Sequence, residues 1–109
     1  MLVLVNSKIS NEDLKKAAED LEGYIKFVVD IDKEVLTAGG KWHVEGEQLL
    51  LKEGSKQENL WGGGLDLDTN EIDFDSMINV RPDQENTSRE VLHEEVRKKM
   101  EQIARKLLL

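Results

Sequence analysis

Apolar and polar residues alternate in residues 24–31, which is typical of a β-strand with one buried face. One face carries the apolar side chains of Ile25, Phe27, Val29 and Ile31. A short polar stretch at 32–34 and a second apolar run at 35–38 follow directly. The pattern therefore predicts an antiparallel hairpin over residues 24–38.

A second hairpin is predicted over residues 65–81, where apolar positions again alternate with polar ones. Thr69 and Asn70 are suited to the turn between its strands. This register places Leu67 opposite Ile72 and, on the other face, the carboxylates of Asp66 and Asp73 opposite each other. Such facing charges are unfavourable unless a cation lies between them.

Helical spacing of apolar residues predicts two helices and indicates a third. Ser10 is a suitable N-cap for a helix that ends before Gly23. The C-terminal helix is predicted to begin at Thr87 or Ser88, because Thr87 and Glu90 have capping-box spacing. At about 20 residues it would be about 30 Å long. Residues 41–53 fit a strand or a short helix, and the helix is favoured.

Together with an apolar strand at residues 2–5, these elements follow the order β-α-β-β-(α)-β-β-α. We predict one α+β domain over residues 1–109, with a mostly antiparallel sheet of about five strands and a long amphipathic C-terminal helix. The helices are expected to cover one face of the sheet.

Composition narrows the classes of function. The chain has no cysteine, which excludes thiol catalysis and zinc–thiolate sites, and its net charge is −8. That charge repels phosphates and anionic lipids, so nucleic acid and membrane partners are disfavoured. The apolar run at Met1–Val5 is too short for a signal peptide or a membrane span. We therefore expect a cytoplasmic protein.

The polar loop before the C-terminal helix is the best candidate for a ligand site, because a strand end and a helix N-terminus meet there and arginines can grip a small anion. Its candidate residues are Asn79, Arg81, Gln84, Asn86, Ser88 and Arg89. The alternative is structural: these side chains would cap the helix and satisfy the loop backbone.

Further polar residues could complete a pocket with this loop. The candidates are Asp30, His43, Glu58 and Trp61. For Trp61, which precedes three glycines, and for Trp42, a role as a core anchor is favoured over one in a pocket or partner surface. Asp30, Asp66 and Asp73 are weak candidates for binding Mg²⁺ or Mn²⁺, since these ions prefer oxygen ligands. No cofactor is otherwise predicted.

The apolar stripe of the C-terminal helix either packs entirely on its own sheet or extends beyond it as an interface, and both alternatives stay open. It comprises Leu92, Val96, Met100, Ile103 and Leu107, and its excess over one small sheet would be buried by a homo-oligomer. The leading hypothesis is thus a homo-oligomeric binding module with a small-anion site. One alternative is a divalent-metal-dependent hydrolase of a phosphate-containing substrate. Asp30 with His43 or Glu58 would hold the metal or act as the base, and Arg81 and Asn79 would stabilise the anionic transition state. Another is a structural subunit of a larger assembly.

Several short motifs resemble a small prokaryotic family of about 110-residue domains of unknown function. They are Tyr24-Ile25-Lys26, Val29-Asp30-Ile31, Gly39-Gly40, His43, Gly54-Ser55, Gln57-Glu58, Trp61-Gly62 and Ile78-Asn79-Val80-Arg81-Pro82, with Gln84, Asn86 and Ser88. The resemblance covers nearly the whole chain and implies a standalone domain with no assigned activity. It places the family's recurrent polar residues at Asp30, His43, Glu58, Asn79, Arg81 and Asn86.

Overall fold

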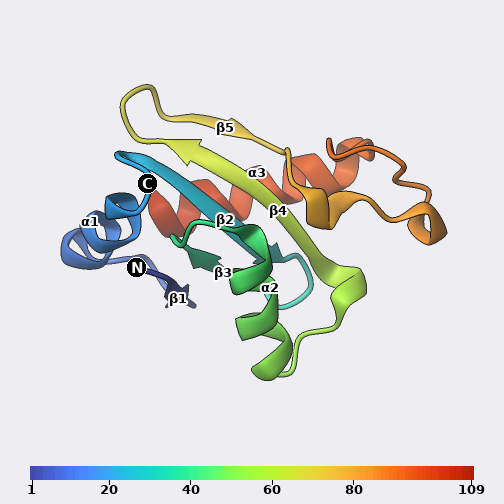
Figure 1. Cartoon of the computed structure of the whole chain (residues 1–109), viewed down its shortest axis with the longest axis horizontal. Coiled ribbons are helices and arrows are strands. Elements are labelled where there is room, and N and C mark those ends of the chain that lie inside the picture. Colours follow the sequence, from blue (N-terminus) through green and yellow to red (C-terminus); the bar gives the residue numbers. More distant parts are fainter.

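The alternating stretches form strands of one five-stranded antiparallel sheet in a computed structural model, which describes all 109 residues (Figure 1). The strands are β1 (Val3–Val5), β2 (Tyr24–Asp30), β3 (Val35–Ala38), β4 (Leu60–Asp66) and β5 (Glu71–Asp73). The helices are α1 (Asn11–Glu19), α2 (His43–Lys52) and α3 (Glu94–Leu108). Short 3₁₀ turns lie at Gln57–Asn59, Met77–Asn79 and Pro82–Gln84. The strand order is β1-β3-β2-β4-β5, so the α+β class with a mostly antiparallel sheet is confirmed.

Helices cover both faces of the sheet, and the expectation of a single covered face was wrong. The larger core, with Phe27 and Val29, packs against α1 and α3. A smaller core lies on the opposite face, where Val28 and Leu60 contact Leu50 of α2. In Figure 1, α2 and α3 lie on opposite sides of β2 and β4. Successive strand residues point to opposite faces, so Phe27 and Val29 belong to the larger core and Val28 between them belongs to the smaller one.

The hairpin of β4 and β5 is shorter than predicted, and its register differs. Leu65 pairs with Ile72 and Asp66 pairs with Glu71, so Asp66 and Asp73 are not opposite each other. Local hydrogen bonds make the turn four residues long: Asn70 N–H donates to the carbonyl of Asp66, and Asn70 has the left-handed φ of 61°. After Asp73 the chain leaves the strand and enters the Met77–Asn79 turn.

The C-terminal helix begins at Glu94, with His93 as N-cap, and not at Thr87 or Ser88. Its 15 residues make it about 22 Å long. Residues 89–91 instead pair with residues 74–76 around an isolated antiparallel bridge between Glu90 and Asp75: Ser76 N–H donates to the carbonyl of Arg89 and Val91 N–H donates to that of Phe74. Apolar residues of the helix are buried against its own protomer: Met100, Ile103, Ala104, Leu107 and Leu108. Leu92 lies before the helix and is exposed.

Other local predictions are confirmed. Ser10 caps α1 by accepting a hydrogen bond from Asp13 N–H at 3.1 Å. The ambiguous 41–53 segment contains the helix α2, whose first turn is held by the Glu45 carboxylate accepting from Trp42 N–H at 3.0 Å. None of the helices has the length and apolar character needed to cross a membrane.

Candidate functional site

Beyond the end of β5, side chains take the place of a strand and hydrogen-bond the free backbone edge of β4. Asn79 is fully buried and bonds Gly62 in both directions: its Oδ1 accepts from Gly62 N–H at 2.8 Å, and its Nδ2 donates to the Gly62 carbonyl at 2.9 Å. The same Nδ2 lies 3.2 Å from the carbonyl of Phe74 and 3.1 Å from that of Arg89. The Asn79 amide therefore replaces the backbone of a neighbouring strand.

Arg81 binds the same edge of β4 two residues before Gly62, at Leu60. Its Nη2 donates to the carbonyl of Leu60, its Nη1 to the carbonyl of Gln57 at 2.6 Å, and its Nε to that of Ile78 at 3.0 Å. The guanidinium also lies 4.2 Å from the centre of the Trp61 ring. Burial lowers the pKa of Arg81 from its ordinary value, while Glu47 and Asp83 oppose the shift. The donors of Arg81 are thus directed at the protein's own carbonyl groups.

Asn86 organises the loop that follows. This buried amide donates to the carbonyls of Asn79, Ser88 and Glu90 at 2.8, 3.0 and 3.0 Å. Its Oδ1 accepts from Leu92 N–H at 2.8 Å. These bonds hold residues 86–92 in an irregular, non-helical conformation, which explains why the capping-box pattern does not start a helix. Gln84 joins the network by donating to the carbonyl of Glu58 at 3.0 Å.

Three glycines in β4 allow neighbouring side chains to pack directly against the backbone of the strand. A Cβ on Gly64 would lie 1.7 Å from the Tyr24 hydroxyl, and one on Gly63 would lie 2.8 Å from the Phe27 ring. A Cβ on Gly62 would lie 2.7 Å from Cβ of Ser76. The glycines at 62–64 are therefore part of the regular strand β4. Trp61, which precedes them, is 2 % exposed and is a member of the larger core, so it acts as a core anchor.

Asp30 lies far from the other two candidate metal ligands, Asp66 and Asp73, which both lie beside Tyr24. Asp30 is buried and accepts hydrogen bonds from Asp32 N–H, Lys33 N–H and the Ser55 hydroxyl at 2.9, 2.9 and 2.6 Å. Asp66 pairs with Tyr24, six residues along β2 from Asp30 and therefore about 20 Å away. Asp73 accepts from the Tyr24 hydroxyl at 2.6 Å. Glu58 is exposed in the Gln57–Asn59 turn.

A hollow of about 240 Å³ opens between the start of α2 and the Met77–Asn79 turn. We call it the α2 hollow. Its lining consists of Lys26, Trp42, His43, Val44, Ser76, Met77, Ile78 and Arg89. Trp42 and Met77 are each 65 % exposed, and Val44 is 49 % exposed. Nζ of Lys26 lies 5.2 Å from the centre of the Trp42 ring.

The α2 hollow has a basic lining in an acidic protein. Lys26, His43 and Arg89 contribute basic groups, and no aspartate or glutamate lines the hollow. Arg89 is paired with Asp75 at 3.0 Å, whereas Lys26 forms no salt bridge. The lining therefore combines a free cation with an exposed aromatic ring.

His43 is anchored on the floor of this hollow. Its Nε2 lies 2.7 Å from the carbonyl oxygen of Gly63. Burial lowers the pKa of His43 from its ordinary value of 6.5, as does the nearby charge of Lys26, while the Gly63 hydrogen bond and the charges of Asp73 and Asp75 act in the opposite direction. The imidazole is accordingly held in its neutral form at neutral pH.

The sequence located this hollow only in part. Of the predicted site residues, His43 and Arg89 line it, while Asn79, Arg81 and Asn86 lie together in the β4 edge network, outside any hollow. Lys26 and Met77 also line the hollow and were not predicted from the sequence. Trp42, expected to be a core anchor, is exposed. The usable signal was the position of Lys26 on the polar face of the alternating stretch.

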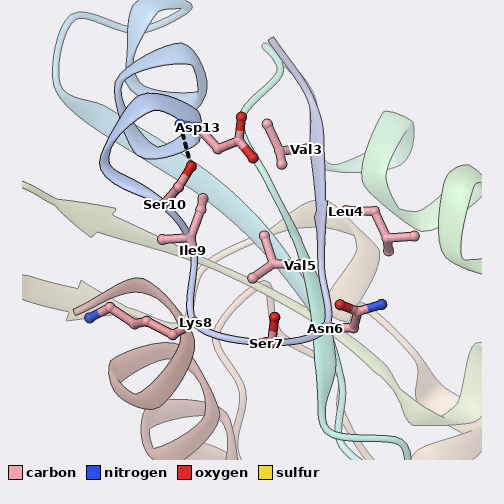
Figure 2. Close-up of a pocket in the computed structure, with 9 residues that line it drawn as sticks. All are labelled: Val3, Leu4, Val5, Asn6, Ser7, Lys8, Ile9, Ser10 and Asp13. Carbon is pink, nitrogen blue, oxygen red and sulfur yellow. Dashed lines mark hydrogen bonds between the residues drawn. The ribbon is translucent and has the colours of Figure 1, made fainter.

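Another hollow, of about 270 Å³, lies beside β1 and is lined by residues 3–10 and Asp13 (Figure 2). Figure 2 shows Lys8 extending away from the other lining side chains. This hollow contains no aromatic residue. Its lining comes from one continuous segment, the connection from β1 into α1, so it does not join distant residues into a site.

The fold and its network of buried amides define a small α+β domain with a five-stranded antiparallel sheet covered on both faces. The chain belongs to the family described as protein of unknown function DUF5674, which matches residues 3–107. The small uncharacterised family predicted from the motifs is thereby confirmed. No curated protein and no solved structure matches the chain.

Proposed function

We propose that this protein is a binding module that holds a small anionic ligand in the α2 hollow. The observation that carries the proposal is the lining: a free lysine, a histidine and an exposed tryptophan, without any acidic side chain, in a chain of net charge −8. Isolated exposed apolar residues are common on proteins, but a contiguous group around a concave site is typical of ligand binding.

The proposal keeps the small anion expected from the sequence and changes the site. The loop before α3 was the expected position, but the donors of Arg81 and the amides of Asn79 and Asn86 are bonded to the protein itself. Lys26 lies over the Trp42 ring but forms no salt bridge, so its charge is available to a ligand. Cytoplasmic location, prokaryotic origin and homo-oligomer formation remain predictions, and light scattering measures the last.

The test is a titration of the ¹⁵N-labelled protein with benzoate, 4-hydroxybenzoate, inorganic phosphate and adenosine monophosphate, followed by amide and indole chemical shifts. We expect at least one probe to shift the signals of Trp42, His43 and Met77 with a Kd of about 1 mM or lower. Lys26→Gln should weaken that binding, while Lys52→Gln, at the opposite end of α2, should not. Absence of any shift at these residues with all four probes would overturn the proposal.

A further inference from the structure

Nδ1 of His43, in the lining of the α2 hollow, is a hydrogen-bonding atom without a partner, since only Nε2 of the ring contacts the protein. A carbonyl oxygen only accepts hydrogen bonds, so the Nε2 that contacts Gly63 must carry the proton. In a neutral imidazole the other nitrogen is then an unprotonated acceptor. Burial of the ring favours this neutral state, since it lowers the pKa of His43.

The orientation of the ring places this acceptor away from the sheet. Cδ2 of His43 lies 3.0 Å from the position that a Cβ on Gly62 would take, and Nε2 faces the Gly63 carbonyl. The Cδ2–Nε2 edge therefore faces β4, and Nδ1 is on the opposite edge of the ring. Nδ1 is also absent from the buried atoms without a hydrogen-bond partner, which are Thr37 Oγ1, Glu47 Oε2 and Trp61 Nε1. It is thus accessible to solvent and to a ligand.

Lys26, Trp42 and the volume of the hollow limit the charge, shape and size of the ligand. The ammonium group of Lys26 lies over the Trp42 ring at 5.2 Å, which puts the positive charge beside an aromatic surface. A ligand that uses both must carry its anionic group next to a flat apolar part. The volume of about 240 Å³ is below the usual range for drug-sized ligands, which begins at about 300 Å³. One aromatic ring fits this size.

We propose that the ligand is a single-ring aromatic anion whose ring bears an O–H or N–H group that donates to Nδ1 of His43. The anionic group is held by Lys26 and the ring lies against Trp42 and Met77. This inference rests on the proposed function and adds to it the required donor. Carboxylates and phosphates share the anionic chemistry, and both are covered by the probes below.

The experiment compares 3- and 4-hydroxybenzoate with their methoxy ethers, and 4-hydroxyphenyl phosphate with 4-methoxyphenyl phosphate, by isothermal titration calorimetry. Methylation removes the donor and preserves the ring and the charge. We expect at least one hydroxyl compound to bind about tenfold more tightly than its ether, which is the usual contribution of one hydrogen bond.

Two substitutions, one at His43 and one at Lys26, provide the matched controls. His43→Gln retains a donor for the Gly63 carbonyl and removes the Nδ1 acceptor, so it should abolish the preference for the hydroxyl compound. Lys26→Gln should weaken the hydroxyl compound and its ether to the same extent. A preference that persists in His43→Gln would assign the donor contact to another group and overturn the inference.

The tautomer itself has a separate readout. Long-range ¹H–¹⁵N spectra of the folded protein at pH 7.5 should show a protonated Nε2 and an unprotonated Nδ1 for His43, and the Nδ1 signal should move when the hydroxyl compound binds. If hydroxyl and methoxy compounds bind equally well and both depend on Lys26, the donor inference is overturned while the proposed function stands. If no compound binds at the α2 hollow, both are overturned.

Discussion

Asn79 shows how one side chain can replace a strand. Its amide places a C=O acceptor beside an N–H donor in one plane, the two groups that a residue presents to a sheet edge, and its second N–H is left for the carbonyls of Phe74 and Arg89. Bonded to both polar groups of Gly62, it extends the edge protection of β4 beyond β5 without further strand residues. An exposed strand edge is a site for unwanted pairing, so this amide and Arg81 also protect the sheet from association.

His43 should make the stability of the protein dependent on pH between 7.5 and 5.5. Its pKa is lower in the folded state than the ordinary 6.5, chiefly because of burial. The unfolded state therefore binds a proton first as pH falls, and stability present above pH 6.5 is lost as pH falls through the folded pKa. Urea unfolding of the wild type and of His43→Gln at pH 7.5, 6.5 and 5.5 measures this effect. A variant with the same pH dependence as the wild type would contradict it.

At the scale of elements, the segment between β5 and α3 depends on bonds to Asn86 and not on local propensity. Thr87 and Glu90 have the spacing of a helix start, yet Glu90 forms an antiparallel bridge with Asp75. The four bonds of the Asn86 amide and the contacts of residues 89–91 with residues 74–76 together outweigh that signal. A cap contributes about 1 kcal/mol, whereas leaving several buried polar groups unsatisfied costs more.

Asn86→Ala and Thr87→Ala should consequently have very different effects on stability. Asn86→Ala leaves three carbonyls and one N–H without their partner and should lower the free energy of unfolding by about 2–4 kcal/mol. Thr87 is exposed and caps no helix, so Thr87→Ala should change it by less than about 0.5 kcal/mol. Chemical denaturation measures both. Equal losses from the two substitutions would show that the capping box contributes to the folded state.

On the scale of the whole molecule, the sheet joins two cores of unequal size. The larger one lies under α1 and α3, and the smaller one under α2 has three fully buried members, Val28, Leu50 and Leu60. The α2 hollow lies at the N-terminal end of α2, so the smaller core holds the helix that supplies Trp42 and His43 to the hollow. Packing on this face thereby positions the proposed site.

Leu50→Ala should test whether the two cores unfold together. Leu50 is 1 % exposed, and its truncation should cost about 2–4 kcal/mol. Because β2 and β4 are shared by both cores, we expect a single urea transition with an unchanged slope. Leu92→Ala, at a residue that is 54 % exposed, should shift the midpoint little. An earlier, separate loss of α2 helicity with the sheet intact would contradict this coupling.

The sequence by itself determined the features that depend on neighbouring residues. The alternation of residues 24–31, the N-cap at Ser10 and the helical character of 41–53 all appear in the structure. These signals are local, because side-chain direction in a strand and capping in a helix depend on residues within a few positions. The absence of cysteine and the net charge likewise follow from composition alone.

Only the tertiary structure decided the register of β4 with β5, the start of α3 and the membership of the α2 hollow. Each depends on contacts between residues far apart in the chain, such as Asn79 with Gly62 or His43 with Gly63. Polar residues in one loop look alike in the sequence whether they face a ligand or a backbone carbonyl. Burial separates them: Asn79, Arg81 and Asn86 face inward to complete the sheet, while Lys26, Trp42 and Met77 are brought together at the surface by strand pairing and the packing of α2.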